Sequence, residues 1–446
     1  VFCKQIIGRK TSIVAIFEEP RFKELVMKFK VQVGGLLAGL KPMFAVATKG
    51  TMDKYPGINL VTMKACQGFI EAIADGGHVS ASNEISNETY NLGYECTADG
   101  VATVNATDLN SSLSSFAPST FVIFEIRDGK SGGRELVIHP EGDDDEIQSL
   151  PVQNEHCEYH EPDSKKKIVS ITIRRDTFIS YANKISFAHG EQEQFKNFRY
   201  WMLKAIGTNA LRFAAGSGTR FALAELEGNN LSDSKGTSSI YFPNDQTQPV
   251  ISVLGELKCQ DIVIESQDRS IVISCGKTKI SIYTCDPSIE WPDENKFLER
   301  QSKYNFTTKV GNWKYAIKGI IATNNGEDKT QNKIHSCRLS IDFAKRIIQA
   351  STSTSLKSCR KVQIEDIATN EDNKEIVVSC VANYINEIIS KASDDDYLQF
   401  EIDALDKPIM VRYYAGKDAG DAKTFKKPTE DGTNERYSVF FATLKA

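Results

Sequence analysis

The sequence predicts an α+β fold in which one unit recurs: a short strand, an amphipathic helix of about three turns, and several further strands. Three observations predict this fold. Strand-like alternation gives way to helical spacing at several places along the chain. Polar, turn-rich segments at 155–167 and 290–305 separate the groups. The 446 residues also exceed what one hydrophobic core normally holds, so we expect several domains.

The clearest unit begins with a strand at Lys167, continues in a helix over Thr177–Ala188, and ends in strands that reach Leu226. Further units are expected around helices that show the same apolar spacing. In chain order these helices are Pro20–Phe29, Lys64–Ile73, Gln248–Leu257, Trp313–Ala322 and Val381–Ala392. Six such half-modules would form three domains, over residues 1–160, 165–300 and 304–446.

The first domain has the least regular pattern. Its expected strands, in chain order, are Ser12–Phe17, Val31–Ala38, Met43–Thr48, Ile58–Thr62, Tyr90–Cys96, Gly100–Asn105 and Ser111–Ser115. In the second domain, Leu211–Ala215 and Arg220–Leu226 alternate as two strands of a hairpin. The intervening Gly216–Thr219 contains two glycines, which permit a positive φ and a close backbone approach.

The composition is that of an ordinary globular protein, and the net charge of −5 does not indicate general nucleic-acid binding. The ten cysteines are scattered singly, without a CxxC pair, and we expect them to be small buried hydrophobes in a reducing compartment. No apolar run has the length of a membrane span, and the first residues lack a signal-peptide pattern. We therefore expect a cytoplasmic protein without a membrane partner.

Motifs for covalent chemistry are absent from the sequence: it has no P-loop, GxSxG or HExxH. His139, His156, Cys157 and His160 could be considered for zinc, but they lie in or near a hydrophilic linker, so we expect no metal. The acidic runs Asp143–Asp145 and Asp394–Asp396 are typical of solvated surface. We expect no enzyme and no cofactor. A metal-dependent nucleic-acid enzyme and a β-rich structural protein stay open as alternatives.

Basic and aromatic residues interleave near the predicted helices. If these helices share one face of a ring, that face could follow DNA phosphates without distinguishing bases. The alternative is an ordinary solvated helix surface. The residues expected to contact DNA are Arg174, Arg175, Lys184, Lys196, Arg199, Tyr200, Trp201, Lys314 and Lys318.

Several segments, in this order and spacing, resemble the bacterial DNA polymerase III beta subunit, or sliding clamp, family. They are Asn105–Leu109, Phe198–Leu203, Leu211–Ala224, Trp291–Asp293, Glu375–Ala392 and Phe441–Ala446. The chain departs from the family at Gly216–Phe221, where the family's aspartate and histidine are replaced, and at Thr443, which stands in place of a proline. The resemblance indicates a divergent member.

The resemblance implies a DNA-clamp fold with three domains, joined head to tail as a homodimeric ring around double-stranded DNA. It also implies that a polymerase catalytic subunit and a clamp loader bind through short linear motifs. The implied peptide pocket comprises Met202, Gly216, Gly218, Thr219, Arg220, Phe221, Pro292, Lys296, Phe297, Phe440, Thr443 and Leu444. The implied dimer interface includes Ile320 and Ile321.

Overall fold

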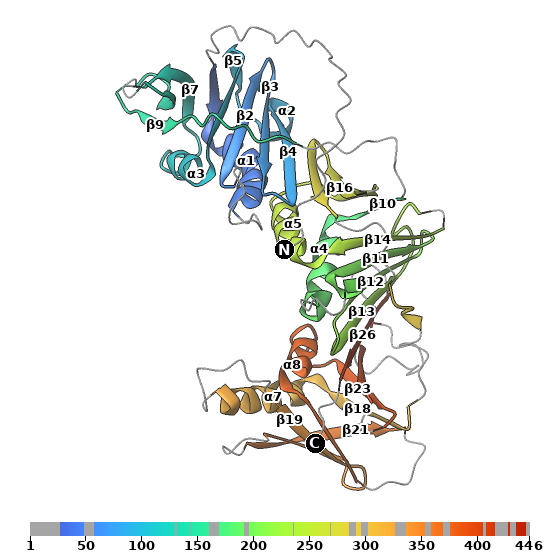
Figure 1. Ribbon diagram of the computed structural model, residues 1–446. Helices are drawn as coiled ribbons and strands as arrows, with labels where there is room; N and C mark the ends of the chain where they lie inside the picture. The colour runs from blue at the N-terminus through green and yellow to red at the C-terminus, as the bar shows by residue number, and fades with distance from the viewer. Residues whose placement is uncertain are drawn as a thin grey trace, which may run out of the picture.

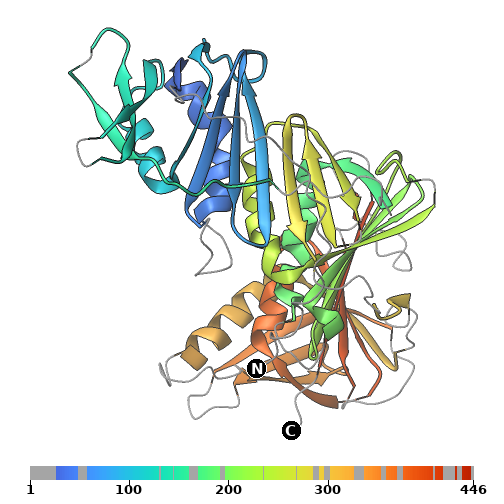
Figure 2. The same cartoon turned by 45° about the horizontal axis from the view of Figure 1, so that its top comes forward.

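The structure, a computed structural model, describes residues 27–48, 58–129, 132–143, 145–159, 169–190, 196–234, 236–267, 269–284, 291–295, 302–325, 336–352, 358–368, 375–404, 407–414, 427–428 and 434–442. In this part of the chain, three α+β units follow one another along an arc (Figure 1). The helices lie on the inner side of the arc and the sheets on its outer side (Figure 2). None of the described helices is both long and apolar enough to cross a bilayer.

The first unit contains two copies of a strand–helix–three-strand module. The first copy consists of β1 (Lys28–Gln32), α1 (Val33–Thr48), β2 (Leu60–Cys66), β3 (Phe69–Asp75) and β4 (Val79–Ser86). The short elements α2 (Asn87–Tyr90) and β5 (Glu95–Ala98) lead to the second copy. That copy consists of β6 (Gly100–Asn105), α3 (Ala106–Ser114), β7 (Phe121–Asp128), β8 (Arg134–Pro140) and β9 (Gln148–Pro151).

The second unit repeats this order. Its first copy consists of β10 (Val169–Arg174), α4 (Arg175–Ile185), the 3₁₀ turns η2 (Ser186–Ala188) and η3 (Lys196–Arg199), β11 (Tyr200–Ile206), β12 (Ala210–Gly216) and β13 (Arg220–Glu227). Its second copy consists of β14 (Thr237–Pro243), η4 (Asn244–Gln246), α5 (Thr247–Gly255), β15 (Asp261–Ser266), β16 (Ser270–Cys275) and β17 (Thr278–Tyr283).

The third unit follows the same plan. Its first copy consists of β18 (Tyr304–Lys309), α7 (Val310–Asn325), β19 (Ser336–Asp342), β20 (Ile347–Thr352) and β21 (Cys359–Ile367). Its second copy consists of β22 (Glu375–Val381), α8 (Ala382–Ser390), β23 (Tyr397–Ile402), β24 (Ile409–Tyr414), the short β25 (Lys427–Pro428) and β26 (Asn434–Phe441). The predicted α+β clamp fold of two half-modules per domain is confirmed by this arrangement.

The two modules of each unit interlock. The strand that precedes the helix of one module pairs with the strand that follows the helix of the other. These antiparallel pairs are β1–β7 and β6–β2, β10–β15 and β14–β11, and β18–β23 and β22–β19. Each module thus completes the sheet of its neighbour, and both helices of a unit cover a shared core.

Neighbouring units are joined by backbone pairing. The last strand of a first module pairs with the last strand of the second module in the next unit: β4 with β17, and β13 with β26. The arc therefore has continuous sheets across both junctions (Figure 2). At its ends, β9 pairs only with β8 among the described strands, and residues 359–363 of β21 pair only with β20.

Apolar residues at helical spacing anchor the helices to the sheets. In α4, Phe178, Tyr181, Ala182 and Ile185 are buried, which is the spacing of one face of an amphipathic helix. This spacing is visible in the sequence, and the predicted helices of the second and third units correspond to α4, α5, α7 and α8.

Several predictions for the first unit are wrong. The helix expected over Lys64–Ile73 is the hairpin β2–β3. The strands expected at Val31–Ala38, Met43–Thr48 and Ser111–Ser115 lie mainly in α1 and α3. The strand expected at Tyr90–Cys96 is mostly the irregular segment 91–94 between α2 and β5. Residues 27–29 of the expected helix Pro20–Phe29 precede or begin β1. The strand expected at Ser12–Phe17 lies outside the described residues.

The helix α1 was not predicted from the sequence because it contains glycines and a proline. Its sequence contains three glycines and Pro42, residues that normally disfavour a helix interior. Here the glycines permit close packing. A Cβ on Gly35 would lie 2.8 Å from the main-chain oxygen of Tyr90, and one on Gly39 would lie 2.7 Å from Cγ2 of Ile85. Tertiary packing therefore overrides local propensity in this helix.

One pair of cysteines departs from the expectation of small buried hydrophobes in a reducing compartment. Cys259, which follows α5, and Cys275, at the end of β16, form a disulfide with their Cα atoms 5.9 Å apart. A spacing of 16 residues does not indicate which cysteines will meet. Cys157, Cys337 and Cys380 are buried and free, as expected for small hydrophobes.

Gly35→Ala should lower the free energy of unfolding by about 1–3 kcal/mol, because the added methyl meets rigid backbone. Urea denaturation followed by circular dichroism measures this change. The matched control is Gly255→Ala in α5, where a Cβ meets nothing within 4 Å. The control should be neutral or stabilising. Equal effects of the two changes would contradict the packing explanation for α1.

Candidate functional site

The β12–β13 hairpin lies at the junction of the second and third units. Its strands correspond to the predicted hairpin and pair from Ala210↔Glu227 to Gly216↔Phe221. The turn is held by the Ser217 N–H, which donates to the Arg220 carbonyl oxygen at 2.7 Å, and by the Arg220 N–H, which donates to Ser217 Oγ at 3.2 Å. Because side chains alternate along a strand, Arg220 and Phe221 belong to opposite faces of the sheet.

Phe221 is part of an apolar cluster on the outer face, separate from the main core. We call it the outer apolar cluster. Its buried members are Met202, Ala214, Phe221, Leu223, Met410 and Phe440, and Phe198, Tyr241 and Trp291 pack against it. The β13–β26 register places Phe221 opposite Phe440, with ring centroids 6.1 Å apart. The structure thus brings together three of the predicted pocket residues from both units: Met202, Phe221 and Phe440.

Gly216 has a packing role in this cluster. A Cβ at Gly216 would lie 2.6 Å from the Phe198 ring and 2.9 Å from the Phe221 ring. Neither Gly216 nor Gly218 is among the described glycines with positive φ, so the turn does not use the positive φ that glycine permits. The predicted close approach at Gly216 involves two aromatic side chains of the cluster.

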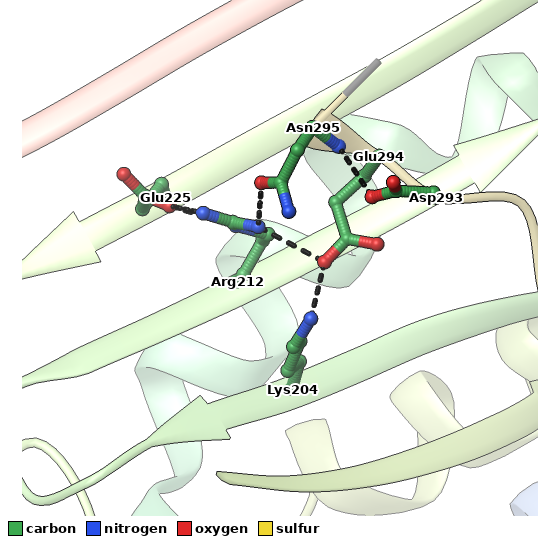
Figure 3. A network of polar contacts seen from close by, with 6 residues as sticks. All are labelled: Lys204, Arg212, Glu225, Asp293, Glu294 and Asn295. Atoms are coloured by element: carbon green, nitrogen blue, oxygen red, sulfur yellow. Dashed lines mark hydrogen bonds and ion pairs between the residues drawn. The ribbon is translucent and has the colours of Figure 1, made fainter. Parts of the chain in front are cut away.

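The segment 291–295 crosses the outer face of β11 and β12 and is fixed there by charged side chains (Figure 3). The Glu294 carboxylate accepts hydrogen bonds from Lys204 Nζ at 2.5 Å and from Arg212 Nη1 at 2.9 Å. Arg212 also donates to Glu225 through Nε at 2.7 Å. Burial raises the pKa of Glu294, but the hydrogen bonds from Lys204 and Arg212 outweigh it, so this pKa lies below its ordinary value.

Arg220 faces a different space on the helix side of the sheet. It lines a cavity of about 920 Å³ together with His189, Arg199 and Tyr200. Its guanidinium lies 5.4 Å from the ring centroid of Tyr384 in α8, and its Nε has no hydrogen-bond partner among the described residues. Burial lowers the pKa of His189 to about 4, and the charge of Arg220 acts in the same direction.

The neighbouring Thr219 also contacts the third unit. Its hydroxyl lies 3.1 Å from the Tyr384 hydroxyl. Pro292 lies in the described linker and is partly exposed. The other predicted pocket residues, Lys296, Phe297, Thr443 and Leu444, lie outside the described residues.

The residues predicted to contact DNA differ in environment: some are buried or paired, and others lie nearer the surface. Trp201 is 1% exposed and stacks on Phe242, and its indole N–H donates to Thr247 Oγ1 at 2.8 Å, so its prediction as a DNA contact is wrong. Lys184 forms an ion pair with the buried Glu435 of β26, so its charge is compensated at the junction of the units. Tyr200 is 9% exposed and borders the cavity described above.

The remaining basic residues lie nearer the surface. Arg174 and Lys318 are exposed. Arg175 is partly exposed and pairs with Asp176 at 2.8 Å, and Lys314 pairs with Asp394 at 2.6 Å. The backbone of Lys196 begins η3. Of the predicted DNA contacts, Arg174, Arg199 and Lys318 are thus the ones that the structure places at exposed positions.

Ile320 and Ile321 differ in environment. Ile320 is fully buried in the core of its own unit, so its side chain is not available for the dimer interface that the resemblance implies. Ile321 is partly buried and packs against the same core.

The residues considered as possible zinc ligands have other partners. His156 Nδ1 lies 2.8 Å from Thr103 Oγ1, and the Cys157 thiol donates to the Leu60 carbonyl oxygen at 3.5 Å. His160 lies outside the described residues. Among the described residues, no three His, Cys, Asp or Glu side chains gather as metal ligands would.

Sequence reasoning missed most of the outer apolar cluster. The missed members are Phe198, Ala214, Leu223, Tyr241 and Met410, whereas Trp291 lies in a segment that carries the family resemblance and directly precedes the predicted pocket residue Pro292. Alternation along β13 could have identified Leu223, because it lies two residues from Phe221 on the same face. Tyr241 and Met410 come from strands far apart in the chain, and only the pairing of β14 and β24 reveals their position.

Solved structures show the same fold at low sequence identity. The DNA polymerase III beta chain of Streptococcus pneumoniae matches with a TM-score of 0.73 and 12% identity, covering 94% of this chain and 100% of that one. The sliding clamp of Pseudomonas aeruginosa bound to griselimycin matches with a TM-score of 0.72 and 14% identity, and the beta subunit of Thermotoga maritima matches with a TM-score of 0.70 and 14% identity. Each match covers 94% of this chain and 100% of the other chain. No family model and no curated protein matches the sequence. The chain therefore has the sliding-clamp fold.

His189 should make the protein less stable in mild acid. Its pKa is about 4 in the folded protein, below the ordinary 6.5, so the unfolded chain binds the proton more readily. Stability is complete above that ordinary value and falls as the pH drops toward 4. Between pH 7 and pH 5 this one group removes about 2 kcal/mol. Urea denaturation at both pH values should show a smaller loss for His189→Asn. An equal loss in both proteins would contradict this assignment.

Proposed function

We propose that this protein is a DNA sliding clamp: a non-catalytic ring that encircles double-stranded DNA and tethers replication proteins. The observation that carries the proposal is the rule by which its units join. Each junction pairs the last strand of a first module with the last strand of a second module. The clamp fold of the solved beta subunits supports the same assignment.

Among the described residues, the joining rule leaves one strand edge unpaired at each end of the arc. These edges are residues 359–363 of β21, the last strand of a first module, and β9, the last strand of a second module. By the same rule, β21 of one copy pairs with β9 of another, and two copies close head to tail. Charge favours this pairing, since Arg360 and Lys361 are exposed on β21 and Asp143 and Glu146 are exposed in the loop before β9.

Closure would place the inner helices around the DNA. Contacts would come from the exposed Arg174 and Lys318, with Arg199 at the mouth of the cavity. Few contacts suit a clamp, because phosphate binding is independent of sequence and weakens with salt, which lets the ring slide. Topological linkage, and not tight binding, would keep the protein on DNA.

The outer apolar cluster is the proposed docking site for short peptide motifs of a polymerase catalytic subunit and a clamp loader. A comparison of the two junctions supports this assignment. In the second junction Phe221 stands opposite Phe440, whereas at the matching position of the first junction Ser80 stands opposite Ser281. The backbone arrangement is the same, so the pair of phenylalanines is a feature of the second junction, whereas the outer face of the first unit has a smaller apolar cluster of Leu60, Ile73 and Cys157. Aromatic and aliphatic anchors of a peptide bury well against such a surface.

The ring proposal predicts a dimer that is retained on circular DNA. Sedimentation should give twice the chain mass, and the protein should leave nicked circular plasmid far more slowly than the linearised plasmid. Arg360→Glu with Lys361→Glu should weaken the dimer at least about tenfold, because like charges would then face each other. Lys345→Glu with Lys407→Glu, at exposed positions of the same unit, is the matched control. A monomer that leaves both DNA forms equally fast would disprove the ring.

The docking proposal predicts that Phe221→Ala weakens binding of a short synthetic peptide with leucine and phenylalanine anchors by at least about tenfold, the effect of losing a central aromatic contact. Isothermal titration calorimetry measures this loss. Ser80→Ala, at the matching position of the first junction, should leave peptide binding unchanged. The dimer and the circular dichroism spectrum should be retained in both variants. Equal affinities of Phe221→Ala and the unchanged protein would contradict the assignment.

A further inference from the structure

Trp291 is the aromatic residue that the linker adds to the outer apolar cluster. Its ring lies 6.0 Å from Phe198 in a perpendicular arrangement, 6.4 Å from Phe221 and 6.0 Å from Tyr241, measured between centroids. These three rings come from η3, β13 and β14. Trp291 therefore lies over the cluster at the place where three elements meet.

The indole N–H of Trp291 has an unusual environment. It is buried and has no hydrogen-bond partner among the described residues. The two other tryptophans differ, since Trp201 donates to Thr247 Oγ1 at 2.8 Å and Trp313 donates to Thr308 Oγ1 at 2.7 Å. A buried N–H without an acceptor is unfavourable, so most such groups in proteins are paired. The cluster around Trp291 thus offers a donor that a bound molecule could satisfy.

The linker holds Trp291 in this position through charged side chains three residues further on. Glu294 is 4% exposed and accepts from both Lys204 and Arg212 (Figure 3). The same Arg212 donates to Asn295 at 3.4 Å. Because Lys204 and Arg212 project from adjacent strands of the sheet, they fix the linker, and with it the tryptophan, relative to β11 and β12.

We propose that Trp291 is the specificity-determining residue of the docking site, and that its indole N–H donates to a main-chain carbonyl of the bound peptide. The inference rests on the proposed function of the cluster. An extended peptide fits this chemistry, because it supplies carbonyl acceptors along its length while its alternate side chains fill apolar space. Glu294 acts as a positioning residue through the linker.

The test uses the full chain and the synthetic leucine–phenylalanine peptide. Trp291→Phe keeps an aromatic ring and removes the N–H, and should weaken peptide binding about fivefold, the effect of one neutral hydrogen bond. Glu294→Gln should weaken it about threefold by loosening the linker. Asp293→Asn is the matched control, since it retains an acceptor for the Asn295 N–H and should bind as the unchanged protein does.

Nitrogen-15 NMR of the indole groups measures a chemical shift that would not change on peptide binding if Trp291 had a purely structural role. On peptide saturation, the Trp291 indole proton should shift downfield, while those of Trp201 and Trp313 should stay in place. Unchanged affinity of Trp291→Phe together with an unmoved Trp291 signal would overturn the inference and leave the docking proposal standing. No binding of the peptide to the unchanged protein would overturn both.

Discussion

The candidate functional site depends on the backbone pairing between β13 and β26. This pairing joins eight residues of each strand, from Arg220↔Phe441 to Glu227↔Asn434, across the junction of two units. An unpaired edge strand exposes a row of backbone donors and acceptors, so such edges tend to be covered or paired. Because this pairing fixes the register, it also fixes which side chains of the two units meet, and Phe221 meets Phe440 as a consequence.

Side chains, and not backbone, distinguish the two junctions. At the first junction the linker packs by small polar contacts and by a small apolar cluster. The Cys157 N–H donates to Thr62 Oγ1 at 2.8 Å, Thr62 Oγ1 lies 2.8 Å from Thr103 Oγ1, and Cys157 and Tyr159 pack with Leu60 and Ile73. At the second junction the linker packs by the aromatic ring of Trp291 and the buried charge of Glu294. Both junctions therefore have an apolar cluster beneath the linker, but the cluster at the second junction is larger and rich in aromatic rings.

The sequence predicted the repeated module because helical and strand periodicity are local properties. The prediction was correct for the helix α4, because its buried residues show regular spacing. It failed for α1, because the glycines of this helix are explained only by the residues that pack against them. The candidate site was predictable at Met202, Phe221 and Phe440 through the family resemblance. It was not predictable at Met410, because that residue joins the cluster only through the register between β24 and β26.

Side chains alternate along β13, so the neighbouring residues Arg220 and Phe221 lie on opposite faces of the sheet. Phe221 belongs to the outer apolar cluster, while Arg220 lines the inner cavity with His189 and contacts Tyr384 of the next unit. A change at Phe221 therefore acts on the outer face, and a change at Arg220 acts on the helix side and on the contact between units. The resemblance assigned both residues to one pocket, but the pleat of the strand gives them different neighbours. Position on a face, more than position in a motif, determines what each residue of this hairpin can do.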